Sequence, residues 1–126
     1  MDIETLREHC LSVKGAEECF PFDDTVLVFK IMGKMFAYIS LNPGADGFFV
    51  NLKCDPERSL ELRERYAGIV RGYHAGNSLM WNSVYIESDV PARLIVELIA
   101  HSVDEVIKKL PKKQQELYRR MCNEND

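Results

Sequence analysis

The chain has 126 residues, of which 46% are hydrophobic and 29% charged, as expected for one globular domain that buries its own core. No apolar run approaches the ~18 residues that span a membrane, and Met1 to Glu4 lack the basic and apolar regions of a signal peptide. We therefore expect a single cytoplasmic domain over residues 1–126 without a membrane partner. The net charge of −4 counts against a dedicated nucleic-acid binder. The charge is uneven, however, with an acidic segment at 1–24 and a basic segment at 108–120.

The cysteines do not form a recognisable metal or disulfide pattern. They stand at irregular spacings without a C-x-x-C pair, at Cys10, Cys19, Cys54 and Cys122. We expect no zinc site, no disulfide framework and no cofactor, with the thiols acting mainly as small hydrophobic groups.

The chain begins with a predicted helix and a short strand. Apolar residues at helical spacing favour a helix over residues 3–13, with Asp2 as its N-cap and Gly15 beyond its end. A short edge strand is expected at 17–20, before the proline that interrupts pairing.

An antiparallel meander is predicted next. Its three strands are expected at residues 25–31, 34–40 and 48–53. Met32-Gly33 stands where a tight hairpin turn needs positive φ. In the second strand, alternation predicts two sets of side chains on opposite faces. These sets are Met35, Ala37 and Ile39 on one face, and Phe36 and Tyr38 on the other.

The second half predicts helices around another hairpin. Asp55-Pro56 is a strong helix start, because Asp caps free N–H groups and Pro suits the first helical position. The second hairpin is predicted from 69–73 and 81–87. Ser88 or Asp89 is expected to cap the longest helix, which carries a broad apolar stripe and ends at Pro111. A short basic helix over 112–121 completes the chain.

These elements predict an α+β fold with an antiparallel sheet and helices on one side, in the order α-β(3)-α-β(2)-α plus a short C-terminal helix. One chemical possibility within it is a thiol enzyme. Cys54 would be the nucleophile, with a pKa lowered by the helix N-terminus, and His74 the base, oriented by Asp55 or Asn82. The alternative is that Cys54 only fills space at a strand end.

A cluster around the second hairpin suggests binding instead. Arg71, Tyr73, His74, Trp81 and Asn82 combine a cation, two aromatic rings, an imidazole and an amide, which can stack on bases and bond to phosphate. The alternative is that the two rings are cross-strand core residues and the amide ties down the loop.

His101 presents a similar choice. On the long helix it is either a ligand or proton-transfer group, or a side chain at the edge of the apolar stripe that bonds to backbone.

Several short motifs, in order, resemble the MmcQ/YjbR family of small bacterial proteins over nearly the whole chain. They are Gly15-Ala16-Glu17-Glu18, Phe20-Pro21-Phe22, Phe29-Lys30, Gly33-Lys34-Met35-Phe36-Ala37, Asn51-Leu52-Lys53-Cys54-Asp55-Pro56-Glu57, Gly72-Tyr73-His74, Trp81-Asn82, His101-Ser102 and Leu110-Pro111-Lys112-Lys113. The resemblance implies an α-β(3)-α-β(2)-α fold. Its members are commonly labelled DNA-binding, because their two hairpins look like a double wing. Here the loop before Trp81 lacks the family's usual Lys and His, and Val103 replaces a tyrosine.

Three functional hypotheses follow. The first is a non-enzymatic protein that binds DNA or another anionic partner. Its expected binding residues are Lys30, Lys34, Lys53, Arg71, Tyr73, His74, Trp81, Asn82, Lys112 and Lys113. The second is a protein- or peptide-binding adaptor that resembles secretion chaperones and uses a sheet edge or a homodimer face. The third is the thiol enzyme.

Overall fold

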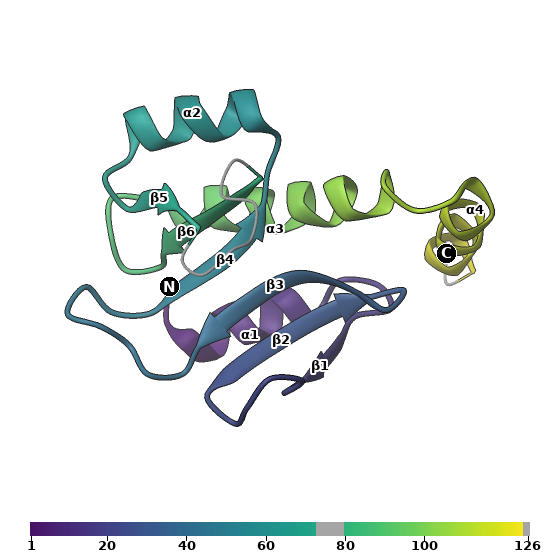
Figure 1. The fold of residues 1–126 in the computed structure, drawn as a ribbon, viewed down its shortest axis with the longest axis horizontal. Helices are drawn as coiled ribbons and strands as arrows, with labels where there is room; N and C mark the ends of the chain where they lie inside the picture. Colours follow the sequence, from purple (N-terminus) through teal and green to yellow (C-terminus); the bar gives the residue numbers. More distant parts are fainter. Residues whose placement is uncertain (73–79, 125–126) are drawn as a thin grey trace.

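The computed structural model describes residues 1–72 and 80–124. Within these residues, four helices and six strands follow one another (Figure 1). They are α1 (Ile3–Leu11), β1 (Glu17–Cys19), β2 (Val26–Ile31), β3 (Lys34–Ser40), β4 (Phe49–Lys53), α2 (Pro56–Arg65), β5 (Ile69–Arg71), β6 (Trp81–Tyr85), α3 (Ala92–Ile107) and α4 (Lys112–Asn123). The predicted α+β class and element order are confirmed, with β1 as the short edge strand.

All six strands form one sheet in the order β1-β2-β3-β4-β6-β5. Every neighbouring pair is antiparallel. The chain leaves β4 through α2, forms the edge strand β5, and returns as β6 between β5 and β4. The second hairpin therefore extends the sheet begun by the first.

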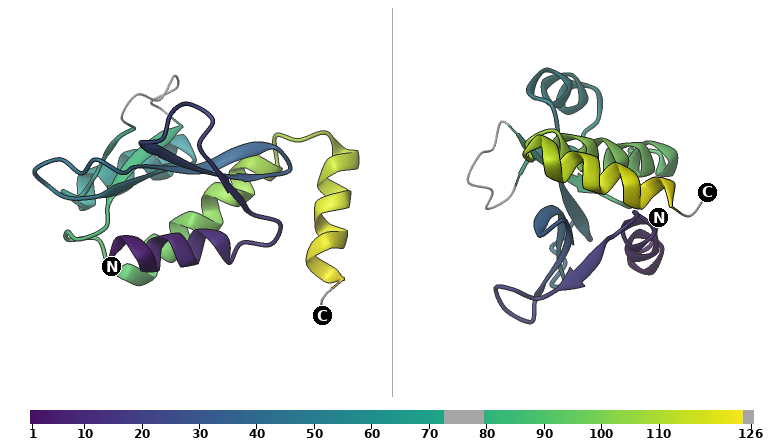
Figure 2. Two further views of the ribbon diagram at one scale, coloured as in Figure 1. Left: turned by 90° about the horizontal axis from the view of Figure 1, so that it is seen from below. Right: turned by 90° about the vertical axis from the view of Figure 1, so that its right-hand side faces the viewer.

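The helices cover one face of this sheet. Figure 2 shows α1 and α3 lying across that face, while α2 lies at its β5 end. Leu62 of α2 joins the same buried cluster as Ile69 of β5 and Ile95 of α3. None of the helices among residues 1–72 and 80–124 crosses the opposite face (Figure 2). In the same part of the chain, no helix is long and apolar enough to cross a membrane.

A β-bulge changes one predicted side-chain direction. Phe29 pairs with Ala37, whereas Lys30 pairs with Met35, so Phe36 is the extra residue on β3. The bulge turns Phe36 into the helix-covered core, where it is fully buried and its ring centroid lies 6.3 Å from that of Phe29. The prediction that Phe36 shares a face with Tyr38 is wrong, because strict alternation fails at a bulge.

The predicted caps of the first two helices are confirmed. The carboxylate of Asp2 accepts a hydrogen bond from the N–H of Thr5, and that of Asp55 accepts one from Arg58. The predicted cap of α3 is wrong: Pro91 occupies the N-cap without a side-chain hydrogen bond.

Asp89 instead ties α3 to the start of β5. Its two carboxylate oxygens accept the backbone N–H groups of Ala67 and Gly68, each at 2.8 Å. Ser88 donates to the Tyr85 carbonyl and closes the turn after β6. Asp89 thus makes a tertiary contact instead of capping the helix. The local sequence does not distinguish these two roles of a polar residue before a helix.

The turn between β2 and β3 and the C-terminal helix are both well defined. The predicted hairpin turn is confirmed, since Met32 and Gly33 both have positive φ, at 50° and 76°. The C-terminal helix runs to Asn123 and projects from the sheet (Figure 1). Tyr118 anchors it, because its ring is buried and its hydroxyl donates to the Lys14 carbonyl at 2.8 Å.

Candidate functional site

The face of the sheet away from the helices, here called the helix-free face, carries an unusual set of side chains. Register and alternation place one side chain from every second position of three central strands on it. They are Tyr38, Phe49, Asn51, Lys53, Trp81, Ser83 and Tyr85. None of these belongs to the hydrophobic cluster beneath the helices.

Four of these side chains form two aromatic pairs. The ring centroids of Tyr38 and Trp81 are 5.5 Å apart at an interplanar angle of 54°. Those of Phe49 and Tyr85 are 5.2 Å apart at 51°. All four residues are partly exposed, so both pairs combine mutual support with access to a partner.

A buried polar pair separates the two aromatic pairs. Ser83 donates to the side-chain oxygen of Asn51 at 2.6 Å, and the Asn51 amide donates to the Tyr38 carbonyl at 3.4 Å. Asn51 and Ser83 are only 2% and 1% exposed. The hydrogen bonds of Asn51 and Ser83 therefore link β3, β4 and β6 between the two aromatic pairs.

The Tyr38–Trp81 end of the face is basic. Lys53 is directly opposite Trp81 in the β4–β6 register. Burial lowers the pKa of Lys53, and the nearby cations Lys109 and Lys108 lower it further, against the opposing effect of Glu105. Three lysines therefore lie near two carboxylates, those of Glu105 and Asp55, and Lys108 is paired with Glu105 at 2.9 Å. The remaining positive charge favours an anionic partner.

The Phe49–Tyr85 end is acidic. A hollow of about 470 Å³ lies there, lined by Tyr85 and Val70 and by the carboxylates of Asp46, Glu87 and Asp89. Like charges would repel phosphate at this end. The charge distribution therefore orients any anionic partner toward Tyr38 and Trp81.

Behind the basic end, α3 is bound to the junction between β4 and α2. Three consecutive backbone N–H groups, those of Lys53, Cys54 and Asp55, each find a different acceptor. The first donates to Ser102 Oγ at 2.9 Å, the second to the Met80 carbonyl at 2.7 Å, and the third to His101 Nε2 at 3.1 Å. A backbone hydrogen bond therefore fixes each residue of this junction, from Lys53 to Asp55.

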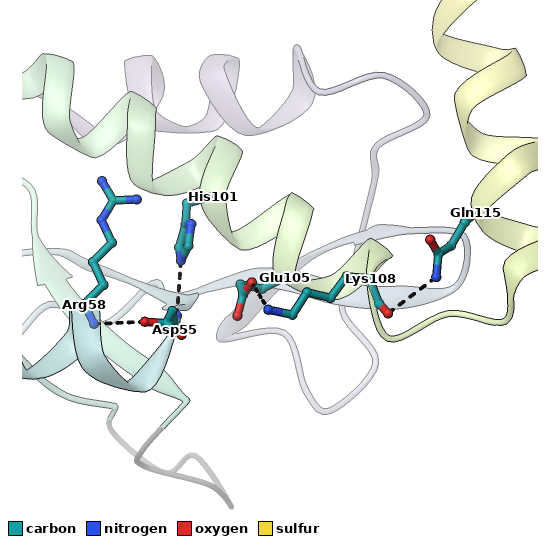
Figure 3. A network of polar contacts seen from close by, with 6 residues as sticks. All are labelled: Asp55, Arg58, His101, Glu105, Lys108 and Gln115. Atoms are coloured by element: carbon teal, nitrogen blue, oxygen red, sulfur yellow. Dashed lines mark hydrogen bonds and ion pairs between the residues drawn. The ribbon is translucent and has the colours of Figure 1, made fainter.

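Figure 3 shows His101 pointing from α3 to the start of α2, with Lys108 beside Glu105 further along the helix. Because His101 Nε2 accepts a hydrogen bond, it carries no proton and the imidazole is neutral. Burial lowers the pKa of His101, and the adjacent Arg58 lowers it further, in agreement with that state. Of the two interpretations of His101, the structure supports bonding to backbone.

The predicted activation of Cys54 is wrong. The residue is 2% exposed, and burial raises the pKa of its thiol despite the adjacent helix N-terminus. Its proposed base, His74, lies outside the described residues, as does Tyr73. Asn82, a proposed orienting group, is 2% exposed and bonded elsewhere.

Asn82 forms a buried bridge to α2. Its side-chain oxygen accepts from Arg63 Nε at 2.7 Å, and its amide donates to Ser59 at 3.1 Å. Arg63 also donates to the Trp81 carbonyl at 3.2 Å. This arrangement positions the Trp81 backbone from the helix side of the sheet.

The other predicted binding residues do not form one patch. Lys30 alternates with core residues of β2 and so lies on the helix-free face. Arg71 pairs with Asn82 and lies on the other face. Exposed Lys34 follows the β2–β3 turn, and exposed Lys112 and Lys113 open α4. Both of these segments lie at the end where α3 terminates (Figures 1 and 2).

Sequence reasoning missed Tyr38, Lys108 and Lys109 as members of this region. The signal for Tyr38 was its place in an alternating strand, but its pairing with Trp81 depends on the register across β4. In the sequence, the two lysines are recognisable only as part of the basic segment at 108–120. Within residues 1–72 and 80–124, no group of His, Cys, Asp and Glu side chains could hold a metal ion.

Comparison with known proteins matches the YjbR family model to residues 11–104. The chain belongs to the YjbR family. Escherichia coli O157:H7 YbdF is 37% identical over 116 residues, covering 92% of this chain and 93% of YbdF. YjbR of Escherichia coli K12 is 26% identical over 117 residues, which cover 93% of this chain and 97% of YjbR. The family predicted from the sequence is confirmed.

Solved structures agree with the fold. A Deinococcus radiodurans protein with a DUF419 domain has a TM-score of 0.81 and 37% identity, covering 90% of this chain and 85% of its own. A Pseudomonas syringae protein has a TM-score of 0.69 at 23% identity, covering 81% and 96%, and shares the fold.

Proposed function

We propose that this YjbR-family protein binds DNA through the basic end of its helix-free face. The observation that carries the proposal is the partly exposed Tyr38–Trp81 pair, set beside Lys53 and its neighbouring cations. Aromatic rings next to lysines suit a ligand that has both flat bases and phosphates. We place this activity in the cytoplasm, in keeping with the four free cysteines.

The electrostatics support a small, oriented contact. The whole chain has a charge of −4, so most of its surface repels a polyanion. Lys30 and Lys53 lie on the helix-free face, and Lys108 and Lys109 are near its basic corner. We therefore expect about three phosphate contacts and a salt slope of about −2.7 on duplex DNA, from roughly −0.9 per contact.

A salt titration tests the proposal. Binding of fluorescent DNA, followed by anisotropy, should weaken about forty-fold between about 50 and 200 mM salt. Lys53→Gln should reduce the slope by about 0.9. Lys14→Gln is the matched control, because Lys14 lies in the connection between α1 and β1, outside the strands that form the basic end, and should leave the slope unchanged. Absence of binding at about 50 mM salt would overturn the proposal.

A second candidate is peptide binding at the β1 edge. Beside this edge strand, Phe20 and Phe22 are 51% and 69% exposed, and an edge strand can accept a further strand. A partner that stays bound at ~0.5 M salt, where surface electrostatics are screened, and is lost in Phe22→Ser would favour this function. Binding through the edge should be indifferent to Lys53→Gln.

The burial and raised pKa of Cys54 oppose the nucleophilic role that the thiol-enzyme hypothesis gives it. We therefore propose a binding protein.

A further inference from the structure

We infer that the DNA bound here is single-stranded, and that its unpaired bases stack on the Tyr38–Trp81 pair while Lys53 contacts a phosphate. The inference rests on the proposed function and specifies the form of its ligand. It starts from the position of the aromatic rings on a sheet face rather than at the tip of a helix or loop.

A duplex cannot stack its bases on this pair. In double-stranded DNA each base is stacked between its neighbours, so a protein reaches only base edges and phosphates. A single strand offers the base faces themselves, and sheet-borne aromatic residues stack on such bases in other folds. Tyr38 and Trp81 are partly exposed, and their rings are tilted at 54° to each other, so the two do not form a closed face-to-face stack.

The charges set the extent of the site. The Lys53–Trp81 and Phe49–Tyr85 register positions are four residues apart on β4 and β6, or about 13 Å at the usual strand rise. Beyond the second pair lie Asp46 and Glu87. A phosphate would be repelled there, so we expect two or three nucleotides on the face, about the number that an aromatic sheet surface holds.

The buried polar side chains at the centre of the face give no preference for RNA. Recognition of RNA would use a polar group that bonds to the 2′-hydroxyl. The polar side chains between the aromatic pairs, Asn51 and Ser83, bond to each other and are 2% and 1% exposed. Stacking and charge remain as the means of binding, and neither requires a 2′-hydroxyl.

Trp81 is the only tryptophan in the chain, so its fluorescence reports directly on this site. Titration with oligothymidylate of about eight nucleotides, a length within the usual range of single-strand sites, should quench Trp81 saturably. The duplex of the same length and the matching oligouridylate are the comparison ligands. We expect the single-stranded DNA to bind at least about tenfold more tightly than the duplex at equal salt, from one stacked base.

Matched aromatic variants locate the contact. Tyr38→Leu should weaken oligothymidylate binding about tenfold, by loss of stacking. Tyr85→Leu, in the equivalent pair at the acidic end, should weaken binding much less than Tyr38→Leu, because the carboxylates there repel phosphate. Trp81→Phe, measured by anisotropy of labelled oligonucleotide, should retain most binding because it keeps a ring. Thermal melts show whether each of these variants is folded. If Tyr38→Leu does not fold, Trp81→Phe and Lys53→Gln still test the site.

The outcomes separate the two proposals. Tighter duplex binding without Trp81 quenching would overturn the single-strand inference and leave DNA binding standing. Equal losses in Tyr38→Leu and Tyr85→Leu would also overturn it. Tighter binding of oligouridylate would overturn the assignment to DNA. Failure of every nucleic acid to bind at about 50 mM salt would overturn the proposed function as well.

Discussion

Removal of one hydroxyl, in Ser102→Ala, should destabilise the fold strongly. Ser102 is fully buried, and its Oγ lies between two strands. It donates to the Phe36 carbonyl at 2.6 Å and accepts the Lys53 N–H at 2.9 Å. These groups are at the point where β3 and β4 stop pairing directly, beside the bulge. Alanine would therefore leave a carbonyl and an N–H without this partner.

The magnitude follows from the two lost hydrogen bonds. Each contributes about 1 kcal/mol net, and a group left unsatisfied in the interior costs about 1–3 kcal/mol. Because Lys53 is only partly buried, we expect a loss of about 2–3 kcal/mol in the free energy of unfolding. For a chain of 126 residues, an unfolding entropy of about 2.1 cal/mol/K per residue converts this loss to roughly 8–11 °C in melting temperature.

Urea unfolding and a thermal melt measure both quantities. Ser12→Ala is the control, since Ser12 is exposed and its hydroxyl makes a single bond to the His9 carbonyl at 2.6 Å. We expect less than about 0.5 kcal/mol there. If the two variants lose equal stability with unchanged urea slopes, the reasoning about the buried bridge is refuted.

Because the pKa of His101 is lowered in the folded chain from 6.5, the unfolded chain binds this proton first. Stability should be complete above about pH 7.5 and fall as pH drops below about 6.5, and His101→Gln should lessen that dependence in urea titrations. Asn82→Ala should cost about 2–3 kcal/mol in denaturant unfolding, because it removes the buried acceptor of Arg63; a loss under about 0.5 kcal/mol would contradict this bridge. With a thiol reagent at neutral pH, exposed Cys122 should react well before buried Cys54; equal rates would show that Cys54 is accessible.

The anchoring of α3 connects stability with the proposed site. His101 and Ser102 hold the backbone at Asp55 and Lys53, and Lys53 lies opposite Trp81. The same helix carries Glu105, buried and paired with Lys108 at 2.9 Å. Variants of these helix residues should therefore be compared for folding before their binding is interpreted.

Local sequence patterns predicted much of the fold. Asp55-Pro56 marked a helix start because capping and proline geometry are decided within one turn. Met32-Gly33 marked the hairpin because both residues must adopt positive φ. The apolar stripe of α3 predicted its packing on a sheet, since burial of a helix face needs only its own periodicity.

Features that depend on distant partners escaped prediction. The bulge that buries Phe36 is a mismatch between two strands, and Asp89 bonds to residues more than twenty positions away instead of capping α3. Cys54 appeared activated by a helix N-terminus, but the burial that raises its pKa comes from the whole fold.

The sequence by itself determined the family, the element order, the starts of the first two helices and the Met32-Gly33 turn, because these depend on periodicity and on backbone preferences a few residues long. Only the tertiary structure decided that Tyr38 meets Trp81 across β4, that Asn82 turns inward to Arg63, and that Lys53 stands beside both rings and cations. The physical reason is that sheet order and register bring together residues whose separation along the chain carries no information about their distance in space.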